Sequence, residues 1–242
     1  MNVIFGAILL ILSAAVYYLH YLIFRDAHHI FIYFVGDVGF VFVEVLLVSL
    51  IIHRLLEQRE KKSRLEKINM VIGVFFSELG NRLLVHLSDM DPEIEEKRKE
   101  LRVMSKWPEK EFAFVRERLK RFDFQLDSDK IDITGIKDLL LRKRDMVVRL
   151  LENPNLHEHE TFTDLLQATL HAAEELDWRK NPERLPGKDV EHLKGDLERV
   201  YGTLVKQWLG YMHHLKTNYP YLFSLAVRTN PFDREANPVI RE

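Results

Sequence analysis

The sequence contains no cysteine among its 242 residues. A chain without cysteine forms no disulfide, thiolate zinc site or iron–sulfur cluster, and it has no cysteine nucleophile. It also has only ten glycines. No glycine-rich phosphate loop, dinucleotide turn, His-Glu-x-x-His or Gly-x-Ser-x-Gly motif occurs. These absences favour a protein that is not an enzyme without deciding the question, and they leave the cofactor, if any, unknown.

An excess of positive charge is missing as well, because the formal net charge is −2. Proteins that bind nucleic acid through general attraction need a basic face, so we expect no nucleic-acid partner. The charge that is present is unevenly placed along the chain. The first quarter is apolar, and residues 3–24 contain no Asp, Glu, Lys or Arg at all. The remainder is rich in charges of both signs.

Two long apolar runs, residues 3–24 and 30–53, are separated only by residues 25–29. A helix rises about 1.5 Å per residue, so about 20 apolar residues span a hydrocarbon layer of roughly 30 Å. The sequence therefore predicts a transmembrane helical hairpin over residues 1–53. The alternative is a signal peptide cleaved near Ser13. No basic residue precedes the first run, and the run continues past Ser13 to Phe24, so we expect it to stay uncleaved.

The orientation of this hairpin follows from the basic residues that flank it. The short link contains one basic residue, Arg25, whereas six follow the second run: Arg54, Arg59, Lys61, Lys62, Arg64 and Lys67. Basic residues beside a span stay on the cytoplasmic side. We therefore expect a multi-pass protein of the inner (cell) membrane with both termini in the cytoplasm.

The rest of the chain predicts an all-α architecture, with a cytoplasmic helical domain over residues 54–228 and an irregular tail over residues 229–242. No Gly or Pro follows the second span closely, so that span should continue into the first cytoplasmic helix. Residues 68–79 are apolar enough to suggest a third span or a helix in the membrane interface. Glu78 and the helical spacing of their apolar residues instead favour a core helix. Asp91-Pro92 is typical of a helix start.

The last long helix has the most regular apolar stripe. Its members are Val190, Leu193, Leu197, Val200, Leu204, Trp208, Tyr211, Leu215 and Leu222. Such a stripe needs a long partner, either in this chain or in another subunit. Pro220 should kink or interrupt the helix.

Asp37 and Glu44 are the candidate functional residues, because they are acidic side chains inside the second apolar run. They lie seven residues apart, so a helix places them on nearly the same face. A carboxylate near the centre of a membrane helix costs about 2.5–3.5 kcal/mol on insertion scales, so neither is expected to face lipid. Several copies around a shared axis would form acidic rings that attract cations.

Two further roles for these carboxylates stay open. Glu44 can be protonated and hydrogen-bonded between packed helices, for example to Ser13, His20 or a tyrosine hydroxyl, with Gly36 and Gly39 allowing close approach. Alternatively, the two carboxylates belong to a proton relay.

A second polar set consists of His157, Glu160, His171, Glu174 and His213. Ferritin-like di-metal sites use Glu-x-x-His pairs, but no pair in that order occurs here, and the order is reversed in His171-x-x-Glu174. The apolar pattern places most of this set away from the buried faces. A solvated polar face is therefore the expectation, unless subunit contacts recruit it as a metal site.

The leading hypothesis is an integral membrane protein that forms a homo-oligomer, with a cation pore lined by Asp37 and Glu44 as its candidate activity. One alternative is a non-conducting, membrane-anchored scaffold or sensor that binds a cytosolic protein. The other is a metal-dependent membrane enzyme that uses the His/Glu set. The expected partners are the lipid bilayer, further copies of the chain and, for the scaffold, a cytosolic protein.

Overall fold

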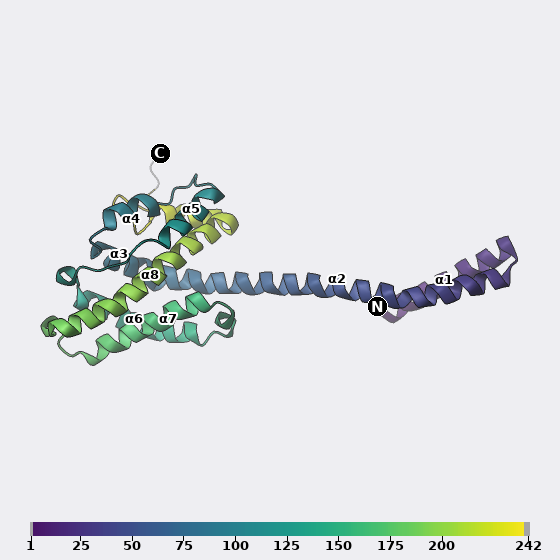
Figure 1. The fold of residues 1–242 in the computed structure, drawn as a ribbon, viewed down its shortest axis with the longest axis horizontal. Coiled ribbons are helices and arrows are strands. Elements are labelled where there is room, and N and C mark those ends of the chain that lie inside the picture. Colours follow the sequence, from purple (N-terminus) through teal and green to yellow (C-terminus); the bar gives the residue numbers. More distant parts are fainter. Residues whose placement is uncertain (1, 240–242) are drawn as a thin grey trace. The chain divides into compact units, whose positions relative to one another are not determined.

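The computed structural model of the chain is helical, as the sequence predicts (Figure 1). The structure describes residues 2–239, without the side chains of residues 2, 3, 157 and 158. No strand occurs between residues 2 and 239. The chain divides into two units, Met1–Lys62 and Ser63–Glu242.

The first unit contains α1 (Asn2–Phe24) and the beginning of α2 (Ala27–Phe75), which run in opposite directions (Figure 1). The link is shorter than expected, because it holds only Arg25 and Asp26. The backbone amides of His28 and His29 donate to Oδ1 of Asp26 at 3.0 and 3.2 Å. This cap starts the second helix early, so both histidines are helical. Arg25 makes the reversal with a positive φ of 50°.

The apolar side chains of this unit are almost all exposed in the single chain. By length and composition alone, two of the helices that the structure describes are apolar enough to cross a membrane, and both are near the N-terminus. The apolar window of each is not buried within the chain. Exposed apolar surfaces of this size are typical of sites that contact a membrane or another protein.

Helix α2 continues without a break from Ala27 to Phe75, as predicted for the second apolar run and the charged segment after it. A π-helical turn, η1 (Phe76–Gly80), then joins it to α3 (Asn81–Asp89). Adjacent Phe75 and Phe76 are both fully buried. The ring of Phe75 contacts Phe162, and the ring of Phe76 stacks on Tyr211. The wider π turn alters the helical register where these two neighbours enter the core.

The remaining elements of the second unit are α4 (Ile94–Leu101), α5 (Glu109–Leu119), η2 (Ser128–Lys130), α6 (Ile133–Leu151), η3 (Pro154–Glu158), α7 (Glu160–Trp178), η4 (Pro182–Arg184), α8 (Gly187–Asn218) and α9 (Pro220–Arg228). Helix α8 is the central element, because α3, α5, α7 and α9 all pack against it. Helix α6 packs on α7. The long stripe of α8 therefore finds its partners within its own chain.

The core confirms most of the predicted apolar positions. Ile68, Ile72, Phe75, Leu79 and Leu83 are buried, so the segment predicted as a core helix is one. The buried members of the last stripe are Leu193, Leu197, Val200, Leu204, Trp208 and Leu215. Leu222 was wrongly assigned to that stripe and is 39% exposed. The helix ends at Asn218 and a new helix begins at Pro220, which ends the periodicity that placed Leu222.

The tail is irregular from Thr229 to Val239, and it packs against the helices. Asn230 and Phe232 are each only 1% exposed. The Asn230 side chain donates to the carbonyl of Leu101 at 3.1 Å. The ring of Phe232 meets Trp208 edge-on, with centroids 5.0 Å apart. Residues 240–242 of the predicted tail lie outside the described residues.

Candidate functional site

Asp37 lies at a hollow between α1 and α2, within the first unit. The hollow has a volume of about 340 Å³. Its other lining residues are Val16, Tyr17, His20, His29, Ile30 and Tyr33. The polar side chains of both helices near the link are thus gathered around one carboxylate.

The rings beside Asp37 contact one another across the hairpin. The imidazoles of His20 on α1 and His29 on α2 stack with centroids 5.9 Å apart. The ring of Tyr33 meets His29 edge-on at 4.6 Å. The chain itself therefore places polar and aromatic side chains near Asp37, whose own side chain is exposed and makes no hydrogen bond or ion pair with a described residue.

Glu44 has no such environment. It is exposed, it does not line the hollow, and it makes no hydrogen bond or ion pair with any residue that the structure describes. Seven residues correspond to 700° of helical rotation, so Glu44 lies about 20° around α2 from Asp37. Residues 3–12 of α1 contain no polar side chain that could pair with it. The suggested partners Ser13 and His20 make no hydrogen bond with Glu44 within the single chain.

Gly36 and Gly39 flank Asp37 on α2. A Cβ atom added at either position would meet no atom within 4 Å. The close helix approach that these glycines allow is therefore not used within the single chain. The surface around them remains open to another helix.

Two members of the second predicted set have other partners in the second unit. Nε2 of His213 contacts the carboxylate of Glu109, and its ring stacks on Phe112 with centroids 4.8 Å apart. Glu174 pairs with Arg144 at 3.5 Å. Both side chains hold helices together, and neither approaches the rest of the set.

The other members are not brought together within the single chain either. Glu160 is exposed at the start of α7. The side chain of His157 lies outside the described residues. Nε2 of His171 lies 3.5 Å from Oδ2 of Asp196 on α8. As the described side chains stand, no three His, Asp or Glu residues are gathered in the geometry of a bound metal ion.

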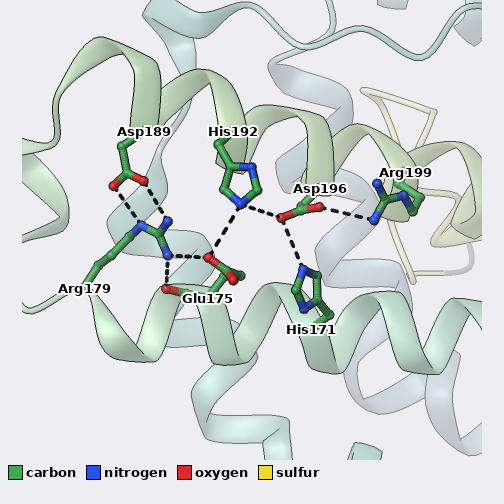
Figure 2. Close-up of polar contacts among 7 residues, drawn as sticks. All are labelled: His171, Glu175, Arg179, Asp189, His192, Asp196 and Arg199. Atoms are coloured by element: carbon green, nitrogen blue, oxygen red, sulfur yellow. Dashed lines mark hydrogen bonds and ion pairs between the residues drawn. The ribbon is translucent and has the colours of Figure 1, made fainter.

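His171 instead belongs to a polar seam between α7 and α8, formed by His171, Glu175, Arg179, Asp189, His192, Asp196 and Arg199 (Figure 2). Arg179 holds one end of it. Its Nε and Nη2 donate to the two oxygens of Asp189 at 2.8 and 2.7 Å, and its Nη1 donates to Glu175 at 2.7 Å. A fork of two parallel bonds fixes a carboxylate more firmly than a single contact.

Arg179 changes the protonation of both carboxylates that it contacts. Its hydrogen bonds lower the pKa of Asp189 and of Glu175 below their ordinary values of 3.8 and 4.5. A lowered pKa means that the folded protein binds fewer protons than the unfolded chain. The seam is therefore most stable above these ordinary values and loses this contribution as the pH falls through the lowered values.

We expect Arg179→Met to destabilise the protein at neutral pH and to make little difference in strong acid, where both carboxylates are protonated. Acid unfolding followed by circular dichroism should start at a higher pH in this variant than in the original protein. Lys180→Met removes a neighbouring positive charge that makes no comparable fork and serves as the control. Parallel acid curves for Arg179→Met and Lys180→Met would contradict this assignment.

The sequence prediction named only His171 among the members of the seam and missed the other six, Glu175, Arg179, Asp189, His192, Asp196 and Arg199. A signal was available, because His171 and Glu175 are four residues apart, as are His192 and Asp196. Residues with this spacing share one face of a helix. What the spacing does not show is that the two faces meet, since that depends on how α7 packs on α8.

Comparison with known proteins identifies relatives over nearly the whole length. Residues 64–228 match the family model described as "Uncharacterized protein MJ1433, C-terminal helical domain", and residues 1–56 match "MJ1433, N-terminal helical domain". The chain is 46% identical over 228 residues to the uncharacterized protein MJ1433 of Methanocaldococcus jannaschii. The match covers 94% of this chain and 92% of that protein. No solved structure matches the chain significantly.

Proposed function

The chain belongs to the MJ1433 family, and we propose from its own residues that it is an integral membrane protein that assembles into a homo-oligomer and conducts cations past Asp37 and Glu44. The two N-terminal helices form the membrane hairpin, and the helical domain of residues 63–242 lies in the cytoplasm.

The exposed apolar surface of α1 and α2 supports a location in a membrane. The 21 residues of Ile4–Phe24 span about 30 Å as a helix, which matches the hydrocarbon core of a bilayer. Water would make so large an apolar surface unfavourable, whereas acyl chains do not. The basic residues that follow the second run support a cytoplasmic location for the second unit.

Glu44 has no polar partner in its own chain, and this observation carries the proposal. It lies in the middle of an apolar run and makes no polar contact with a described residue. An acidic side chain at this depth is unfavourable by about 2.5–3.5 kcal/mol if it faces lipid. Contact with further copies around an axis removes this cost and creates an acidic ring.

The surface of α2 also leaves space for contacts between copies of the chain. Gly36 and Gly39 leave the surface of α2 open on either side of Asp37. Small residues of this kind let membrane helices approach closely. Neighbouring copies can thus pack near the acidic residues while Glu44 faces the shared axis.

We expect purified protein in liposomes to give a cation flux that Glu44→Gln largely abolishes, because the variant removes the ring charge while keeping the side-chain shape. Glu117→Gln changes an exposed acid of α5 and should leave the flux unchanged. The subunit count in mild detergent accompanies this measurement. A monomer, or a flux that Glu44→Gln does not alter, would exclude the pore.

A non-conducting, membrane-anchored scaffold is the second candidate, and the placement of Asp37 favours it. Asp37 lines a hollow of its own hairpin together with Tyr17, His20, His29 and Tyr33, so polar side chains of the same chain lie near this carboxylate without a pore. An oligomer without flux, together with specific capture of a cytosolic protein by the full chain, would support the scaffold over the channel.

A further inference from the structure

Four basic side chains follow the second apolar run, where the charged part of α2 begins. They are Arg54, Arg59, Lys61 and Lys62, which together form a basic collar, and all four are exposed. None of them makes a hydrogen bond, ion pair or ring contact with a residue that the structure describes. The collar therefore presents positive charges that its own chain leaves unpaired.

The acidic residues of the same stretch do have partners. Nε2 of His53 lies 3.0 Å from Oε1 of Glu57. Glu60 also has an interaction partner. Residues 54–62 contain no further acid, so four basic and two acidic residues give the stretch a formal charge of +2. Positive charge that is not neutralised within the helix attracts anions from outside the chain.

Leu55 and Leu56 lie between the first two members of the collar. Their side chains are 54% and 53% exposed. The apolar surface of α2 thus extends two residues beyond Arg54. Long basic side chains at the end of a membrane span keep their stems against apolar surface and place their charge in the headgroup layer. This mixture of exposed leucine and arginine is therefore suited to the boundary between acyl chains and headgroups.

The other members of the collar are within reach of the same layer. Helix α2 is continuous, so Arg59, Lys61 and Lys62 lie about 4.5–9 Å along its axis from Leu56. The headgroup layer on each side of a bilayer is about 5–8 Å thick. The Cα–Cβ bonds of a helix tilt toward its N-terminus, which on α2 is the direction of the apolar run. The side chains thus point back toward the headgroups.

The collar is distributed around the helix. At 100° per residue, Lys61 lies about 20° around the axis from Arg54, Lys62 about 80° and Arg59 about 140°. Lipid molecules surround a membrane helix, whereas an acidic protein contacts one face of it. The wide distribution of the charges therefore favours lipid headgroups over a protein partner.

We propose that the basic collar binds the anionic headgroups of the lipids around the cytoplasmic end of α2. The inference rests on the membrane hairpin of the proposed function. A guanidinium group binds a phosphate through two parallel hydrogen bonds, and an ammonium group binds it as a point charge. Basic residues beside a span attract anionic lipid, and this attraction decreases within one Debye length of the surface.

The test measures which lipids the full chain holds at its perimeter. The chain is reconstituted from detergent into phosphatidylcholine vesicles that contain a trace of spin-labelled phosphatidylglycerol or spin-labelled phosphatidylcholine. We expect the motionally restricted fraction to show an about two- to fivefold preference for phosphatidylglycerol. Salt at about 1 M, where the Debye length is about 3 Å, should remove most of this preference. Both leaflets have the same composition, so the orientation of the chain does not affect the result.

Replacing the four members of the collar by Gln in one chain should nearly abolish the preference, because all the unpaired charges are lost. The four positions are exposed on α2, so this variant should fold. The matched control removes two lysines and two arginines of the second unit that are also exposed and unpaired among the described residues, and it should keep the preference. Its substitutions are Lys106→Gln, Arg121→Gln, Lys180→Gln and Arg184→Gln.

No preference in the original protein, or equal preference in the collar and control variants, would overturn the inference. Loss of the preference when inorganic phosphate replaces chloride at constant ionic strength would also overturn it, because free phosphate would then occupy the collar. Carbonate washing separates this result from the proposed function. A chain that resists carbonate but shows no lipid preference overturns the lipid inference alone, whereas release by carbonate overturns the membrane hairpin as well.

Discussion

Replacing Lys97 by Met should lower the free energy of unfolding by about 3–5 kcal/mol, the cost of leaving a buried charge unpaired. Nζ of Lys97 donates to both oxygens of Asp91, at 2.9 and 2.7 Å. The two residues are each only 2% exposed. Without the ammonium group, the Asp91 carboxylate keeps only the backbone amide of Glu93 as a donor among these contacts.

The surroundings of this ion pair increase the free-energy cost of breaking it. The ammonium group lies 5.5 Å from the centre of the Phe124 ring. The hydroxyl of Tyr201 is buried nearby, and its burial, together with the negative charge of Asp91, raises its pKa. A tyrosine that stays neutral cannot replace the lost positive charge.

Urea unfolding followed by tryptophan fluorescence measures this effect, because Trp107, Trp178 and Trp208 all lie in the second unit. A loss of this size corresponds to about 6–20 °C in melting temperature, at about 2–4 °C per kcal/mol for a domain of this size. Lys97→Met combined with Asp91→Asn should recover part of the loss, because neither charge then remains.

Glu95→Gln is the matched control for the buried pair. Glu95 pairs with Arg98 at 2.8 Å, but its side chain is 62% exposed. Exposed pairs contribute about 0–1 kcal/mol. If Lys97→Met lowered the free energy of unfolding no more than Glu95→Gln, the Asp91–Lys97 pair would not stabilise the fold as a buried ion pair.

The helical class and much of the core could be predicted because they depend on local periodicity. The apolar positions of residues 68–79 and of the last long helix recur at helical spacing, and most of them are buried. Pro220 marked the interruption correctly because it lacks an amide hydrogen. The early start of α2 was missed, although Asp26 is a typical helix cap.

The partners of charged residues could not be predicted in the same way. Asp91 was identified only as part of a helix start, while its salt bridge to Lys97 depends on how that segment packs. The acids Asp37 and Glu44 stand out in an apolar sequence, but the hollow around Asp37 requires the hairpin geometry. The His/Asp/Glu seam requires two helices whose facing is set by the whole core.

Replacing Phe232 by Ala should be the second large effect, with an expected loss of about 3–5 kcal/mol, as for a fully buried aromatic residue. The residue lies in an irregular tail, where a substitution would ordinarily have little consequence. Its ring is 1% exposed and packs edge-on against Trp208 of α8. The backbone amide of Phe232 donates to the side chain of Asn230 at 2.9 Å, which positions the ring.

The cavity left by Phe232→Ala opens beside Trp208, so tryptophan emission should shift toward longer wavelength as water enters. Urea unfolding of the full chain in detergent gives the stability change. Val239→Ala lies in the same tail, where its side chain is 63% exposed, and should change the stability by less than about 0.5 kcal/mol. Equal stabilities for the two variants would show that the tail does not contribute to the core. A loss confined to Phe232→Ala would place the segment after α9 within the folded domain.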